Sequence, residues 1–292
     1  MTLQGCHTAL ITPFHNDAVC FDTLRTLIDR QLAGAVDGIV PMGTTGESPT
    51  VDFREHAKVI ETVIEHVDKR CLVTAGTGAN STREAVQLTR DAAQAGADAT
   101  LQVTPYYNKP TQEGLYRHFS SVADEGGLPV ILYNVPGRSG REIAVDTIAR
   151  LARHPNIVAV KEAGGSVDRV NRILAECEIT VVSGDDSLTL PMMAVGGRGV
   201  ISVASNIVPD RISQMVQAVL DGDWSGATEM HRRLYPLFRD LFIETNPIPI
   251  KAAMAMCGLI EEEYRLPLCH LAPANRAVLE QTLRSLNIIQ PE

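Results

Sequence analysis

Residues 157–165 read Ile-Val-Ala-Val-Lys-Glu-Ala-Gly-Gly, so an apolar, β-branched run ends in a lysine and a glycine-rich turn follows. A run of this kind is typical of a parallel strand that is buried on both faces. Lys161 either extends its ammonium group into water or lies desolvated in a pocket, where burial disfavours the charged form and leaves an amine that can attack a carbonyl. Taken alone, a strand-end lysine that reaches solvent is the simpler interpretation.

The same pattern of a short apolar run followed by an amphipathic, helix-length stretch repeats along the chain. It predicts eight strands, at residues 8–12, 38–42, 71–75, 99–104, 130–134, 157–161, 180–183 and 200–204. Helical patterns lie between them, at residues 22–33, 52–67, 81–95, 111–124 and 144–153. Eight alternating units favour an α/β fold of the (β/α)8 TIM barrel type over an open doubly wound sheet, which usually has about five or six strands.

After the eighth predicted strand the sequence turns largely helical. The helical patterns cover residues 209–220, 225–242, 248–256 and 274–286. This is more helix than a barrel needs to close. We therefore expect a (β/α)8 barrel catalytic domain at residues 1–224 and a C-terminal helical region at residues 225–292.

The composition is that of an ordinary globular protein, with 45% hydrophobic residues in 292. A net charge of −9 and the lack of a basic block argue against nucleic acid or an anionic membrane as a partner. The six cysteines form no CxxC pair and no signal-peptide pattern precedes them, so we expect reduced thiols in a cytoplasmic protein. No stretch is apolar over the ~20 residues that a membrane helix needs, which leaves small molecules as the expected partners.

In a barrel of this kind the active site lies at the carboxyl ends of the strands. The second predicted strand ends in Gly43-Thr44-Thr45-Gly46-Glu47-Ser48, where glycines let the backbone approach a ligand and two hydroxyls are suited to a small anion. The fifth ends near Tyr133, a phenol that can exchange protons, and Arg138 beyond it is a permanent cation suited to a carboxylate. Tyr106 and Tyr107 follow the fourth strand. Singly, each feature also has an ordinary explanation as a turn, a packed ring or a surface cation.

Metal chemistry finds no support in the sequence. Asp185 and Asp186 follow the seventh predicted strand without a histidine or further carboxylate nearby, so we expect them to cap the next helix. Gly196-Gly197-Arg198-Gly199 resembles a phosphate loop, yet it precedes the eighth strand and is better explained as a turn on the opposite face. The eight histidines show no HxH or HxxxH spacing.

One predicted rim of the barrel therefore collects Lys161, Tyr133, Thr44, Thr45 and Arg138. Chance would distribute such residues over both ends of the barrel. The combination makes a desolvated, imine-forming lysine the better interpretation.

With these residues the chain resembles the dihydrodipicolinate synthase family, also called the 4-hydroxy-tetrahydrodipicolinate synthase family, within the pyruvate-dependent lyase and aldolase superfamily. The resemblance runs nearly from end to end and is specific when its motifs are taken together. The motifs are Gly43-Thr44-Thr45-Gly46-Glu47, Thr104-Pro105-Tyr106-Tyr107-Asn108, Tyr133-Asn134-Val135-Pro136-Gly137-Arg138, Val160-Lys161-Glu162-Ala163, Ser183-Gly184-Asp185-Asp186 and Asn246-Pro247-Ile248-Pro249.

The resemblance implies a lyase of lysine and diaminopimelate biosynthesis that needs no metal or organic cofactor and uses pyruvate and L-aspartate 4-semialdehyde. Lys161 would form an imine with pyruvate, whose carboxylate would be held by Thr45 and the backbone around Thr44. The backbone carbonyl of Ile201 would help to set the imine site. Loss of a methyl proton would give an enamine that attacks the aldehyde, while Arg138 binds the carboxylate of the second substrate. Cyclisation onto the imine carbon would then release the lysine.

The family's proton relay corresponds to Tyr133, Thr44 and Tyr107, and Tyr107 would reach in from a neighbouring subunit. The resemblance therefore implies at least a dimer. We expect a homotetramer that is a dimer of dimers.

Feedback-inhibited relatives bind lysine at a subunit interface, and the matching residues here are Ser48, His56, Asn80, Glu84 and Tyr106. Glu84 would pair with the lysine ammonium. Two positions depart from the sensitive pattern, because Phe53 stands where histidine is common and Pro49 replaces a small residue. We therefore expect inhibition by lysine to be weak or absent.

Two alternatives remain open. Another pyruvate-dependent class I aldolase or lyase, such as N-acetylneuraminate lyase or a 2-keto-3-deoxy sugar acid aldolase, would keep Lys161 and Tyr133, although Arg138 argues against it. A non-catalytic barrel that binds a keto acid would have no need of a proton relay.

Overall fold

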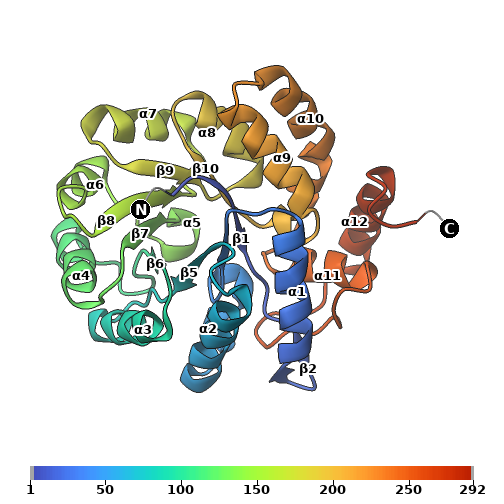
Figure 1. Ribbon diagram of the computed structural model, residues 1–292, viewed down its shortest axis with the longest axis horizontal. Helices are drawn as coiled ribbons and strands as arrows, with labels where there is room; N and C mark the ends of the chain where they lie inside the picture. Colours follow the sequence, from blue (N-terminus) through green and yellow to red (C-terminus); the bar gives the residue numbers. More distant parts are fainter. Residues whose placement is uncertain (1–2, 291–292) are drawn as a thin grey trace.

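The computed structural model describes residues 3–290 and contains a closed barrel of parallel strands with helices around it (Figure 1). Around the barrel the strands follow in the order β1, β10, β9, β8, β7, β6, β5 and β4, and β1 closes the ring between β10 and β4. Their bounds are β1 Gly5–Ala9, β4 Gly38–Val40, β5 Leu72–Gly76, β6 Ala99–Val103, β7 Val130–Asn134, β8 Ile157–Glu162, β9 Thr180–Ser183 and β10 Gly199–Ser202. The predicted (β/α)8 TIM barrel is confirmed.

Helices cover the outside of the barrel, because each crossover between parallel strands buries an amphipathic helix against the sheet. Asp52, Ser81 and Thr111 cap three of these helices by accepting hydrogen bonds from backbone N–H groups of the first turn. The helix bounds are α1 Phe21–Ala33, α2 Phe53–Val67, α3 Thr82–Ala95, α4 Gln112–Glu125, α5 Pro136–Ser139, α6 Val145–Leu151, α7 Val167–Glu176, α8 Thr189–Ala194 and α9 Pro209–Leu220.

Within residues 3–290, three further helices follow the barrel, as the sequence predicted: α10 Trp224–Asp240, α11 Ile248–Met256 and α12 Pro273–Ser285. α10 packs against α9 and α12, and α11 packs against α12. In Figure 1 α11 and α12 lie beside the barrel, on the side of α1. Among the residues that the structure describes, no helix combines the length and the apolarity needed to cross a membrane.

The first strand begins three residues earlier than predicted. The prediction placed it at residues 8–12, but the ladder with β10 starts at Gly5 and fixes β1 as Gly5–Ala9. The apolar residues that suggested the later position lie buried beyond the ladder.

A small hairpin that was not predicted follows β1, with β2 Phe14–His15 and β3 Ala18–Val19. Its turn residues Asn16 and Asp17 have φ of 52° and 63°, the left-handed conformation that a tight hairpin turn needs.

Side chains on β7 and β8 alternate between the barrel interior and the surrounding helices. Tyr133 and Ala159 belong to the interior cluster, whereas Leu132 and Val160 pack outward. Lys161 is the ladder partner of Tyr133 and lies two residues beyond Ala159, so it shares the interior face. The fold thus carries this lysine to the carboxyl end of the barrel, on the inside.

Candidate active site

Lys161 and Tyr133 face each other at the ends of β8 and β7. The exposed fractions of the two residues are 5% and 7%, and Lys161 Nζ lies 4.2 Å from the centroid of the Tyr133 ring. Gly184, after β9, leaves room for the lysine, because a Cβ atom there would lie 2.9 Å from Lys161 Cε. The ammonium group is therefore buried against a phenol rather than extended into solvent.

The turn after β4 carries the two threonines, which begin the short 3-10 helix η1 Thr44–Gly46. Thr45 is buried, and its Oγ1 accepts a hydrogen bond from Asn246 Nδ2 at 3.0 Å. Since this bond uses a lone pair of Thr45, the hydroxyl proton is free to be donated to a ligand. On the other side of the turn, Thr12 Oγ1 donates to the carbonyl of Gly46 at 2.7 Å. The turn is thus held both from the segment that follows β1 and from the segment before α11.

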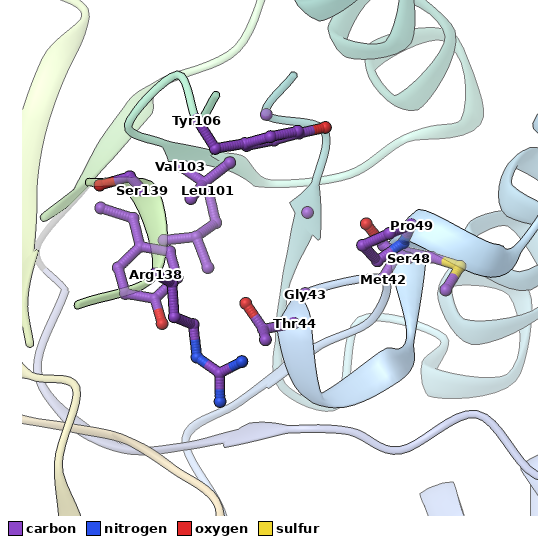
Figure 2. Close-up of a pocket in the computed structure, with 13 residues that line it drawn as sticks. Met42, Gly43, Thr44, Ser48, Pro49, Leu101, Val103, Tyr106, Arg138 and Ser139 are labelled. Carbon is purple, nitrogen blue, oxygen red and sulfur yellow. The ribbon is translucent and has the colours of Figure 1, made fainter. Parts of the chain in front are cut away.

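A cavity of about 230 Å³ opens beside these residues. In Figure 2, Thr44 and the guanidinium of Arg138 lie on one side of it and the ring of Tyr106 lies on the other. Arg138 comes from the short helix α5, and its Nη2 donates to the carbonyl of Asn246 at 3.0 Å. Lys161 adjoins the cavity through the ring of Tyr133, which lines it. The lining residues are Met42, Gly43, Thr44, Ser48, Pro49, Gly76, Gly78, Leu101, Val103, Tyr106, Tyr133, Arg138 and Ser139.

Two other predicted residues lie in contrasting places. Ile201 is 1% exposed and belongs to the same interior cluster as Tyr133. Tyr107 is 91% exposed, with φ of 69°, on the loop after β6. One chain therefore brings Lys161, Tyr133 and Ile201 together in the barrel interior but leaves Tyr107 in solvent.

The residues predicted to bind lysine gather near one wall of the cavity. Ser48 and Tyr106 line it, and Asn80 Nδ2 donates to the carbonyl of Tyr106 at 3.2 Å. Burial, together with the charge of Glu84, raises the pKa of Tyr106. His56 is buried, and its Nε2 lies 3.0 Å from the carbonyl oxygen of Gly76, which it contacts as a donor.

The two positions that depart from the sensitive pattern also lie in different surroundings. Pro49 lines the cavity, and Phe53 is 64% exposed at the start of α2. The ring of Phe53 therefore faces solvent in the single chain.

A sequence model of the dihydrodipicolinate synthetase family matches residues 2–286. The chain belongs to this family. A curated relative from Syntrophotalea carbinolica, named 4-hydroxy-tetrahydrodipicolinate synthase, is 52% identical over 98% of this chain and 99% of its own length. The predicted family and the predicted enzyme class, a lyase, are thereby confirmed.

Solved structures of dihydrodipicolinate synthases superpose closely on this chain. The 4-hydroxy-tetrahydrodipicolinate synthase from the thermoacidophilic methanotroph Methylacidiphilum fumariolicum SolV is 50% identical, with a TM-score of 0.97 over 98% of this chain and 96% of that one. The chloride-inhibited enzyme from Acinetobacter baumannii, complexed with pyruvate, is 43% identical, with a TM-score of 0.96 over 99% of this chain and 100% of that one.

In this member of the family the two aspartates after β9 have different structural roles. Asp185 caps the 3-10 helix η3 Asp186–Leu188, since its side chain accepts from Ser187 N at 2.9 Å, as predicted. The prediction was wrong for Asp186, whose buried carboxylate instead accepts hydrogen bonds from Ser202 Oγ at the end of β10 and from Val203 N and Ala204 N just beyond it. Burial raises the pKa of this carboxyl group. This contact forms because β9 and β10 lie side by side in the folded barrel.

The glycine-rich stretch at residues 196–199 connects α8 to β10, as expected of a turn on the face opposite the catalytic one. Within residues 3–290, no three side chains of the His, Cys, Asp and Glu types come together in a way that could hold a metal ion.

Three contacts near the candidate site were not predicted. Asn246 joins Thr45 and Arg138, although its motif was noted for the resemblance alone. Lys251 pairs with Glu47 in the interior, with Nζ and Oε1 2.5 Å apart. The third contact is made by Glu162, the residue after Lys161, whose buried carboxylate accepts hydrogen bonds from Asn134 and Arg169. For Lys251 and Glu162 the available signal was a charged residue within or at the end of an apolar stretch, whereas the uncharged Asn246 gave no such signal.

Proposed function

We propose that the protein is a 4-hydroxy-tetrahydrodipicolinate synthase that condenses pyruvate with L-aspartate 4-semialdehyde in lysine and diaminopimelate biosynthesis. The observation that carries the proposal is the buried side chain of Lys161, with Nζ 4.2 Å from the ring centroid of Tyr133 and beside a cavity that presents Thr44 and Arg138. The names of the curated relatives and the pyruvate complex of the Acinetobacter relative support it.

In the first step the neutral amine of Lys161 adds to the carbonyl carbon of pyruvate, and the carbonyl oxygen leaves as water. Tyr133 supplies and takes back the protons of this step, and the nearness of its ring to the amine, 4.2 Å from Nζ to the ring centroid, supports this role. The Thr45 hydroxyl and the backbone of the Thr44–Gly46 turn hold the pyruvate carboxylate. The backbone carbonyl of Ile201, on the same interior face, helps to orient the imine.

In the second step the protonated imine withdraws electrons from the neighbouring methyl group, which loses a proton and leaves an enamine. The enamine carbon attacks the aldehyde carbon of the second substrate and forms the new carbon–carbon bond. Arg138 binds the carboxylate of that substrate, since its guanidinium is held at the cavity by the carbonyl of Asn246. The amino group of the bound product then attacks the imine carbon and expels the amine of Lys161.

We propose that Tyr133, Thr44 and Tyr107 form a proton relay that is completed only in an oligomer. Tyr107 is 91% exposed in the single chain, which is an unusual position for a tyrosine of a relay unless a second subunit covers it. A dimer in which each subunit lends Tyr107 to the other would supply the missing phenol. We expect two such dimers to form the homotetramer.

The rival pyruvate-dependent aldolases differ in the second substrate. A sugar acid would call for hydroxyl-binding groups at the outer part of the cavity, whereas Arg138 offers a fixed cation there. Aspartate semialdehyde, which carries a carboxylate, matches this cation better.

We further propose that Ser48, His56, Asn80, Glu84 and Tyr106 are the remains of a lysine-binding site. Lysine would find its ammonium partner in Glu84, but Phe53 and Pro49 change the surface that would surround it. We therefore expect weak inhibition or none.

The barrel at residues 1–224 and the helical region at residues 225–292 form the proposed division of the chain. Because Asn246 and Lys251 reach back to the catalytic turn, we expect the barrel to need the helical region for activity. We also propose a cytoplasmic location, where its six free cysteines would stay reduced.

The proposal is tested by borohydride reduction of the protein in the presence of pyruvate, followed by mass mapping of the adduct. A reduced adduct on Lys161 is expected, and its absence would defeat the imine mechanism. Turnover is then measured with pyruvate and either aspartate semialdehyde or sugar-derived aldehydes. An adduct together with preference for a sugar-derived aldehyde would assign the protein to the aldolase alternative instead.

A further inference from the structure

A buried carboxylate stands one residue beyond Lys161. Because side chains alternate along a strand, Glu162 points away from the barrel interior, and its ladder partner Asn134 stands one residue beyond Tyr133 in the same way. The catalytic pair and this outer pair therefore occupy successive rungs at the ends of β7 and β8. Glu162 and Asn134 are both 0% exposed.

The Glu162 carboxylate is surrounded by hydrogen-bond donors. Asn134 Nδ2 donates to its two oxygens at 2.9 and 3.1 Å, and Arg169 Nε donates at 2.9 Å. The backbone N–H of Gly164 donates at 2.7 Å. These four bonds tie β8 to β7, to α7 and to the turn that follows the lysine, and they compensate for the burial of a charge.

The partners of Glu162 are themselves held. Asn134 Oδ1 accepts from Ile143 N at 3.0 Å, and an Arg169 Nη atom donates to the carbonyl of Ile143. Arg169 also lies 3.2 Å from a carboxylate oxygen of Glu142. The segment after α5, which begins just beyond Arg138, is thus fastened to the same carboxylate. We name Glu162, Asn134 and Arg169 the Glu162 network.

We propose that Glu162 is a positioning residue for the reaction, and that its network sets the approach of Lys161 to Tyr133. The inference rests on the proposed imine chemistry. Strand ends lack ladder bonds beyond them, so the last rung needs another restraint if its side chains are to keep one geometry. The network supplies that restraint to both strands at once. Displacement of a reacting group by about 1 Å can slow a reaction about 100-fold, so a small loosening should be measurable.

The primary test is the variant Glu162→Gln, which keeps the size of the side chain but turns one acceptor oxygen into a donor that faces the other donors. We expect the rate of borohydride-trapped imine formation and kcat to fall at least tenfold, with KM for pyruvate changed less than threefold. The matched control is Asp240→Asn. Asp240 is also buried and is held by Arg239 and Thr282 between α10 and α12. It should lose thermal stability and keep the imine rate.

A reciprocal swap provides the rescue. The double variant Asn134→Asp with Glu162→Gln exchanges the amide and the carboxylate, so the bonds between the two side chains, to Ile143 N and to Arg169 Nε can form again. We expect it to recover the imine rate to within about fivefold of the unsubstituted protein. An E162Q rate within twofold of the unsubstituted protein would overturn the proposal, as would a double variant no faster than E162Q.

A crystal structure of E162Q separates this inference from the proposed function. We expect the distance from Lys161 Nζ to the Tyr133 ring centroid, 4.2 Å here, to change by more than 0.5 Å or the lysine to occupy several positions. If the unsubstituted protein forms no imine, the proposed function fails, and the distance alone decides the role of Glu162. An unchanged distance in E162Q, with the lysine in a single position, would refute the positioning role of Glu162.

Discussion

Replacement of Lys251 by methionine would leave the carboxylate of Glu47 buried without its cation. Both side chains are 0% exposed, and Lys251 Nζ also lies 4.3 Å from the ring centroid of Phe14 and 5.3 Å from that of Tyr264. Burial lowers the pKa of Lys251, although Glu47 opposes the shift, which indicates a strongly desolvated site. Breaking a buried ion pair by removal of one partner costs about 3–5 kcal/mol. Methionine fills most of the same volume, so a cavity adds little.

The loss is measured by thermal unfolding. In proteins of about this size, 1 kcal/mol corresponds to roughly 2–4 °C in Tm, so K251M should unfold about 6–20 °C below the unsubstituted protein. The matched control is the double variant E47Q/K251M, which buries no charge. At position 47 φ is 56°, a conformation that β-branched side chains adopt poorly. Glutamine suits this position because it is unbranched and has the same shape as glutamate. We expect the double variant to recover at least half of the lost Tm.

Two results would refute this reasoning. One is a Tm of K251M within about 2 °C of the unsubstituted protein, which would mean that water or movement of the chain compensates for the charge. The other is a double variant that is no more stable than K251M. Either result would also weaken the view that α11 holds the catalytic turn through Glu47.

Three further predictions concern pH, the second substrate and regulation. Burial lowers the pKa of His118 to about 4, so the unfolded chain takes up its proton near pH 6.5 and the folded protein only near pH 4. Stability should be full above pH 6.5 and should fall by up to about 3 kcal/mol as the pH is lowered to 4. Thermal unfolding of His118→Gln should show a shallower pH dependence, and an equal slope would contradict this assignment. Arg138→Lys should lower turnover with aspartate semialdehyde about 10- to 100-fold, because hydrogen bonds to charged groups contribute about 1.5–3 kcal/mol. Imine trapping with pyruvate should be unaffected, and an equal loss in trapping would place Arg138 in the first step instead. Lysine should not inhibit at low micromolar concentration, and Phe53→His should increase the sensitivity; strong inhibition of the unsubstituted protein would exclude this explanation.

Local patterns were sufficient for most of the architecture. The run at residues 157–161 and the strand at residues 130–134 were placed correctly, because strands buried on both faces leave continuous apolar runs in the sequence. The first strand was misplaced, since its apolar residues extend past the ladder and only the pairing with β10 fixes where it begins. The hairpin at residues 14–19 escaped prediction because two-residue strands carry too little periodicity.

The sequence by itself determined the barrel and the C-terminal helices. It also determined that one rim of the barrel carries Lys161, Tyr133, Thr44 and Arg138. These follow from alternation and from the rule that all strands of a parallel barrel end at the same rim. Only the tertiary structure decided how that rim is supported. Asn246 meets Thr45 across 201 residues and Lys251 meets Glu47 across 204. Contacts between residues so far apart depend on how the helical region packs against the barrel, and no local sequence pattern records that packing.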